Sequence, residues 1–285
     1  RERAHTMTVK GPRVRDFTGT ERTLDIELVH GAAPETLLSM FVFGAGQSDP
    51  SSYDAGADWF DRVEEVVDES ARDTVVNLGE CGEIWLALIG YAIDADAPRS
   101  VAGLAHHLRR TDPISIRSSL LTAIWESGKE RPSDAVVEAA AAGDLDAFDD
   151  ATEITGRTAA GMRRLVGMAP VAAAAEIIGA IESFGKMVDG EVVTVLARDA
   201  ERVSALAATM DPPALVERVT NGITFEMQPD VTGIVLVPSV IVSPWVTLTE
   251  HGSYRVFCYG VEADDAADPA APPARLIEIY KALGD

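Results

Sequence analysis

The hydrophobic pattern of this chain changes its period twice, and this limits the possible folds more than any other feature. Leu24, Ile26 and Leu28 alternate with acidic residues, which predicts a half-buried strand. From residue 34 to about residue 222 the apolar residues mostly follow helical spacing. Strand patterns then return over 233–259. We therefore expect an α+β domain with an N-terminal strand, a mostly helical body and a C-terminal antiparallel meander that pairs with the first strand.

Several predicted helices carry recognisable start signals. Ser100 is a preferred N-cap residue, and Asp112 and Asp211 are each followed by proline at the first helical position. The segment 191–210 contains valines that would suit a strand, but its apolar spacing fits a helix better. We predict a helix there.

The C-terminal strand region has three parts. Ile223, Phe225 and Met227 alternate with polar residues, which favours a strand. The continuous apolar run over 233–237 is typical of a buried strand. The segments 245–249 and 254–259 face each other across a turn that contains glycine, which predicts a hairpin.

One predicted helix offers a place for a ligand. An apolar face over 78–92 includes Cys81 and Trp85, and glycines at 79, 82 and 90 interrupt it. Glycine permits close helix approach or leaves room for a ligand, although most buried tryptophans simply pack in a core. With Trp125 on a neighbouring apolar face, Cys81 and Trp85 form our candidate effector pocket.

Charge and cysteine content exclude several classes of protein. The chain has 24 Lys and Arg residues against 46 Asp and Glu residues, a net charge of −22, which repels nucleic-acid phosphate. Cys81 and Cys258 lie far apart in apolar runs, as reduced thiols do in the cytosol. There is no signal-peptide core and no uninterrupted apolar run of membrane-spanning length. We expect a soluble cytoplasmic protein that does not contact a membrane.

Composition divides the chain into three parts. Residues 1–261 form the predicted α+β domain, and residues 262–273 are acidic and rich in Pro and Ala, as linkers are. Residues 274–285 then carry the apolar spacing of a short amphipathic helix and end on Asp285, a good N-cap for another helix. We interpret this last part as the first helix of a truncated DNA-binding domain.

The tail Ala-Arg-Leu-Ile-Glu-Ile-Tyr-Lys-Ala-Leu-Gly-Asp over 274–285 resembles the entry to the winged helix-turn-helix of ArsR-family transcriptional regulators. The run 235–239, Pro244-Trp245 and Tyr259 look like the end of the large N-terminal domain of one subgroup, and the strand over 24–28 is similar to its start. The resemblance implies a cytoplasmic homodimer that binds operator DNA through a recognition helix, which this chain lacks. This chain would then supply the regulatory and dimer-forming part, with an unknown small-molecule effector.

No motif of catalysis or metal binding accompanies the resemblance. Metal-sensing members of the family carry paired cysteines or clustered His and carboxylate ligands, and the two cysteines form no such cluster. We therefore expect no enzymatic activity, no metal and no cofactor. Two alternatives stay open: a small-molecule enzyme whose site uses loop residues such as Gln47, Ser48 and Asp49, or a plain protein-interaction domain.

Overall fold

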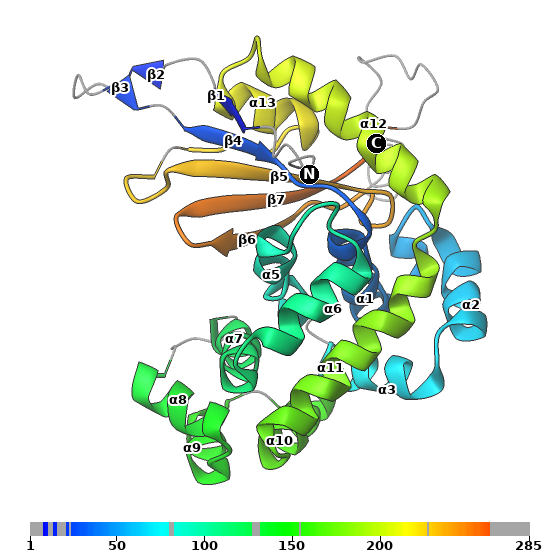
Figure 1. Cartoon of the computed structure of the whole chain (residues 1–285), viewed down its shortest axis with the longest axis vertical. Helices are drawn as coiled ribbons and strands as arrows, with labels where there is room; N and C mark the ends of the chain where they lie inside the picture. The colour runs from blue at the N-terminus through cyan, green and yellow to red at the C-terminus, as the bar shows by residue number, and fades with distance from the viewer. Residues whose placement is uncertain are drawn as a thin grey trace, which may run out of the picture.

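The computed structural model describes residues 8–10, 14–15, 21–22, 24–79, 83–126, 132–153, 155–226 and 228–262 (Figure 1). These residues form a mixed β-sheet, a helical body on one face of the sheet and two helices on the other face. The predicted α+β class is confirmed. None of the described helices is long and apolar enough to cross a membrane.

The main sheet joins the beginning of the chain to its end. Its order is β1 (Thr8–Lys10), β4 (Asp25–Leu28), β5 (Gly233–Ser239), β7 (Tyr254–Gly260) and β6 (Thr247–His251). β2 (Val14–Arg15) and β3 (Glu21–Arg22) form a separate two-stranded ribbon. The predicted strand over 24–28 therefore pairs with the C-terminal sheet, as expected.

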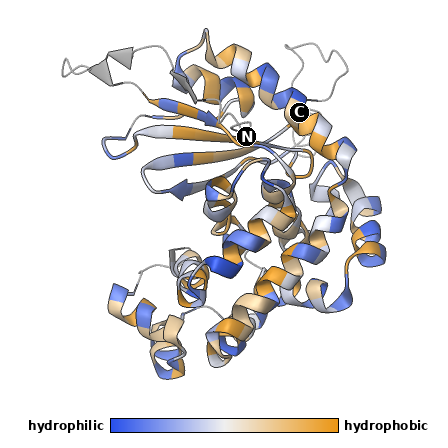
Figure 2. Cartoon of the chain, in the orientation of Figure 1, coloured by the Kyte–Doolittle hydropathy of each residue, from blue (hydrophilic) through white to orange (hydrophobic). Residues whose placement is uncertain are grey.

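Alternation along β5 divides the core between the two faces of the sheet. Ile234 and Leu236 pack into a cluster with α12 (Gly190–Ala207) and α13 (Pro212–Val219), whereas Val235 and Val237 pack against the helical body. Because both faces are covered, β5 is buried along its whole length, and the central strands are the most apolar part of the sheet (Figure 2).

The helical body follows β4 directly and is built around α1 and α11, with the other helices packed against them. Its elements are α1 (Ala32–Ala45), η1 (Gly46–Ser48), η2 (Pro50–Ser52), α2 (Gly56–Val66), α3 (Glu69–Leu78), α4 (Glu83–Leu86), α5 (Ile89–Asp94), α6 (Val101–Arg110), α7 (Pro113–Glu126), α8 (Asp134–Ala142), α9 (Leu145–Ala151), α10 (Gly156–Gly167), α11 (Pro170–Phe184) and η3 (Gly185–Met187).

The predicted start signals hold. The Ser100 side chain accepts a hydrogen bond from the amide of Gly103 at 3.0 Å, and Asp211 accepts one from Ala214 at 2.8 Å. α7 begins at Pro113 after Asp112, and the segment 191–210 forms a helix as predicted, although α12 ends at Ala207. Each cap satisfies a backbone donor that the first helical turn leaves unpaired.

The predicted antiparallel meander is wrong in its strand order. β7 lies between β5 and β6 and runs parallel to β5, and only β6 and β7 form the antiparallel hairpin. β7 is apolar enough for a position between two strands, whereas the Thr-Leu-Thr-Glu-His sequence of β6 exposes Leu248 and Glu250. A polar, half-exposed strand is stable at the edge of a sheet and costly in its centre.

Two local predictions are also wrong. Residues 223–226 form no strand, and Phe225 instead packs its ring against Phe257 with 5.8 Å between ring centroids. The predicted helix over 78–92 is broken into the end of α3, α4 and α5. Gly79 is the C-cap residue of α3, where a helix ends readily on glycine.

Candidate ligand-binding groove

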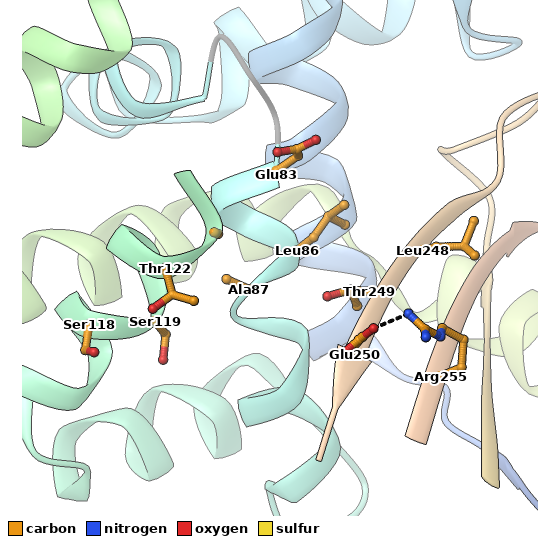
Figure 3. A pocket seen from close by; sticks show the side chains of 11 residues that line it. Glu83, Leu86, Ala87, Ser118, Ser119, Thr122, Leu248, Thr249, Glu250 and Arg255 are labelled. Atoms are coloured by element: carbon orange, nitrogen blue, oxygen red, sulfur yellow. Dashed lines mark hydrogen bonds and ion pairs between the residues drawn. The ribbon is translucent and has the colours of Figure 1, made fainter. Parts of the chain in front are cut away.

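An open groove of about 510 Å³ lies between helices α4 and α7 on one side and strands β6 and β7 on the other (Figure 3). This volume is within the range of small-ligand and peptide sites. The residues that line it are Glu83, Leu86 and Ala87 from α4 and the turn after it, Ser118, Ser119, Thr122 and Ala123 from α7, Leu248, Thr249 and Glu250 from β6, and Arg255 from β7.

The strand side of the groove is the outer edge of the sheet. β6 is the last strand in the sheet order, and its only described partner is β7. Gly252 and Ser253 connect the two strands, and Gly252 has a φ of 57°, which suits the first central position of a type II′ turn. β6 therefore presents one backbone edge that no described strand covers.

The helix side of the groove has small and hydroxyl side chains. Ser118, Ser119, Thr122 and Ala123 occupy two successive turns of α7 and line the groove opposite β6 (Figure 3). Ser119 bonds to the hydroxyl of Tyr91 at 3.0 Å and donates to the carbonyl of Ser115 at 3.1 Å. Small side chains on this face keep α7 from filling the space beside the strand.

The charged side chains of the groove are two carboxylates and one guanidinium. Arg255 pairs with Glu250 across the hairpin and also donates to Oε1 of Gln228 at 2.6 Å. Glu83 has no ion-pair partner within the part of the chain that the structure describes, and it is exposed. A cationic group of a ligand would therefore find a carboxylate that is not already neutralised.

The far end of β6 is fixed to the helical body. Nε2 of His251 lies 2.9 Å from Oδ1 of Asp94 at the end of α5. The His251 ring packs directly on Gly90, where an added Cβ would lie 2.7 Å from its Nδ1 atom. Gly90 thus permits a close approach of α5 to the sheet edge and holds one end of the groove in place.

Of the predicted pocket residues, Trp85 and Trp125 do not line this groove. Trp85 is fully buried in the core on α4, and its indole packs against Gly79, where an added Cβ would lie 2.7 Å from Nε1. Trp125 is buried on α7, where it donates to the hydroxyl of Thr152 at 3.3 Å. Cys81 lies outside the described residues. The groove is instead lined by other residues of the two helices that carry these tryptophans.

The alternative enzyme loop has local hydrogen bonds. Nε2 of Gln47 donates to the carbonyl of Phe43 at 3.0 Å, and the Asp49 carboxylate accepts from Ser51 at 2.6 Å. The side chain of Ser48 lies outside the described part. Among the described residues, no three His, Cys, Asp or Glu side chains cluster as metal ligands do.

A fully buried carboxyl group lies elsewhere, between α1 and the end of β5. Glu35 is in the first turn of α1, and its Oε1 accepts from the amide of Val240 at 3.1 Å, while no described residue donates a hydrogen bond to Oε2. Burial raises the pKa of Glu35 to about 7, although hydrogen bonds from Ser239, Val240 and Ile241 act in the opposite direction. The hydrogen bond from Val240 to Glu35 therefore joins α1 to the turn that follows β5.

A second polar network lies on the opposite face of the sheet, next to the end of the described chain. The buried carboxylate of Asp199 on α12 accepts from Tyr259 at 2.8 Å and from Arg202 at 2.6 Å. Glu262 accepts from Arg218 on α13 at 2.9 Å and lies 3.4 Å from Arg202. The two residues that follow β7 are therefore held close to both helices.

Sequence reasoning missed the groove because its residues come from four distant elements. One signal was available on α7, where Ser118, Ser119 and Thr122 form a polar face between apolar positions. Comparisons with protein-family models, with curated proteins and with solved structures found no match to this chain.

Proposed function

We propose that this chain is the regulatory part of an ArsR-type transcriptional regulator and that the groove beside β6 binds its effector. The observation that carries the assignment is the tail over 274–285, which resembles the entry to the family's winged helix-turn-helix. This tail lies outside the described residues. The proposal assigns DNA binding to a domain that would follow Asp285 and homodimer formation to the present chain.

The position of the groove supports this proposal. Arg255 lines the groove at the start of β7, and the same strand runs to Gly260, two residues before Glu262. The predicted linker begins at Glu262, which α12 and α13 hold through their arginines. A ligand that shifts the β6–β7 hairpin would therefore change the position of the linker through a single strand.

The charge distribution also supports it. A body with a net charge of −22 is repelled by DNA phosphate, so sequence-specific binding would need a separate basic surface. In this proposal the acidic domain binds the effector, and the appended domain binds the operator. The separation of these two roles makes each of them testable alone.

The test is a DNA-binding assay with two proteins. The chain extended by its own downstream coding sequence should shift its promoter DNA specifically, whereas the 285-residue chain should not. Size measurements by light scattering should give a dimer for the extended protein. The proposal would be contradicted by a downstream sequence that does not encode a winged helix, or by an extended protein that does not bind its promoter DNA specifically.

A further inference from the structure

The outer edge of β6 has the hydrogen-bonding groups of an unpaired strand. In a two-residue hairpin the residues that flank the turn, His251 and Tyr254, form a hydrogen-bonded pair, and the bonds to the partner strand then recur at every second residue. Thr249 and Thr247 therefore bond to β7. The backbone N–H and C=O groups of Leu248 and Glu250 point away from β7, toward the open edge.

The groove gives this edge a second wall. α4 and α7 lie across the groove from β6, on the side away from β7 (Figure 3). A strand added to β6 would lie about 4.8 Å from it and would place alternate side chains on the two sides of the sheet. Ala87, Ser118 and Ala123 on the helix wall have small side chains, and the groove between this wall and β6 has a volume of about 510 Å³.

One apolar and one charged side chain of the groove could contact the side chains of an added strand. Leu248 is a large hydrophobic residue with 48% of its surface exposed, on the edge where a cross-strand neighbour would cover it. Glu83 offers a carboxylate without an ion-pair partner among the described residues, whereas the carboxylate of Glu250 is already paired with Arg255. The charge of Glu83 and the net charge of −22 favour a cationic occupant.

From these observations we infer that the groove binds an extended peptide segment with at least one lysine or arginine, which adds as a strand to β6 and places its cation near Glu83. Main-chain bonds to Leu248 and Glu250 supply affinity, and the carboxylate selects the side chain. This inference rests on the proposed function only in that it makes the peptide the effector of the regulator. Binding of the peptide to the groove can be measured without DNA.

The test is an NMR titration of the 285-residue chain with an acetylated, amidated pentapeptide of sequence Ser-Val-Lys-Val-Ser. We expect saturable shifts at the amides of Leu248 and Glu250 and on α4 and α7. The same peptide with N-methylated valines should bind at least about tenfold more weakly, because methylation removes main-chain donors. A peptide with glutamate in place of lysine should weaken by a similar factor.

Protein variants test the two sides of the site. Leu248→Pro removes an outward amide that β7 does not use, so it should abolish binding while the fold is kept. Leu248→Thr keeps that amide and loses only the large apolar side chain, so it should bind more weakly than wild type but more tightly than Leu248→Pro. Glu83→Gln should weaken the peptide about tenfold, and Glu65→Gln, on an exposed part of α2, should have no effect. If Leu248→Pro fails to fold, the N-methylated peptide still tests the backbone contacts.

Three results would overturn the inference. Shifts that n-butylamine reproduces at equal concentration would assign the groove to small amines. A dimer that Leu248→Pro converts to a monomer would assign the β6 edge to a second copy of the chain. No saturable shift at β6 would remove the site altogether. In each case a specific promoter shift by the extended protein would leave the regulator assignment intact.

Discussion

The hydroxyl of Tyr259, on the last strand, donates a hydrogen bond to Oδ2 of Asp199 on α12 at 2.8 Å. Tyr259 is fully buried and Asp199 is almost so. Burial raises the pKa of Tyr259, and the adjacent carboxylate raises it further, so the phenol stays protonated and acts as a donor. The bond joins the strand that leads to the linker to the helix that covers the sheet.

Tyr259→Phe should therefore destabilise the domain. The change leaves one oxygen of a buried carboxylate without its donor, which costs about 1–3 kcal/mol in the free energy of unfolding. Urea unfolding measures this loss. Tyr254→Phe, on the same strand, should change the free energy by less than about 0.5 kcal/mol, since no described residue bonds to its hydroxyl. Equal effects at both positions would refute the role given to Asp199.

Glu35 should make stability fall as the pH rises. Its pKa is about 7 in the folded chain, against an ordinary value of 4.5, so the folded state holds a proton that the unfolded state releases. This contribution is complete below pH 4.5 and is lost as the pH rises through about 7, a change on the order of 3 kcal/mol.

Glu35→Gln, which imitates the neutral acid, should remove this dependence. Urea unfolding at pH 5 and pH 8 should show the wild-type chain losing more stability between the two values than the variant does. A variant with the same loss as wild type would show that the buried carboxyl does not titrate in this range.

Arg117 should be essential for the packing of the helices around α7. Its guanidinium is almost fully buried and donates to carbonyls near the C-terminal ends of two helices: Ala141 on α8 at 3.2 Å, and Val166 and Met168 at the end of α10 at 3.0 and 2.8 Å. Carbonyl oxygens at helix C-terminal ends attract a cation. Removal of the guanidinium would leave these buried acceptors without a hydrogen-bond donor.

Arg117→Met should therefore cost roughly 3 kcal/mol in the free energy of unfolding, because it leaves buried carbonyl oxygens without their donor. Thermal unfolding measures it, with Arg110→Met at an exposed position of α6 as the control. Arg117→Lys should fall between the two, because an ammonium cannot reach all three carbonyls in one geometry. A methionine variant as stable as wild type would mean that the apolar contacts of the Arg117 side chain, and not its hydrogen bonds, stabilise the packing of these helices.

Glu262 should hold the beginning of the predicted linker against α12 and α13. Its partners Arg202 and Arg218 are partly exposed, so Glu262→Gln should change the free energy of unfolding by less than about 1 kcal/mol. Hydrogen exchange should nevertheless become faster at residues 260–262, and high salt should have the same effect on wild type. Glu217→Gln, at an exposed position of α13, should leave this exchange unchanged. Unaltered exchange in Glu262→Gln would show that other contacts hold the linker.

Local signals in the sequence predicted individual elements well. The caps at Ser100 and Asp211 and the helix over 190–207 follow from hydrogen bonding and spacing within a few residues. The same local reasoning failed over 78–92, where glycine ended a helix that the apolar spacing would have continued. It failed again at Phe225, which is buried by a neighbouring ring rather than by a strand partner.

The sequence by itself determined the α+β class and the positions of most helices, because periodicity and capping act over short distances. It also indicated that the first strand joins the last ones, since the only strand patterns stand at the two ends of a helical body. Only the tertiary structure decided that β7 lies between β5 and β6 and that Glu83, Thr122 and Glu250 line one groove. Strand order depends on which strand can bury both of its faces. This depends on how apolar each strand is relative to strands elsewhere in the chain, which a local sequence pattern does not show. A groove lined by four elements likewise has no local pattern, since its residues meet only after the sheet and the helical body have packed.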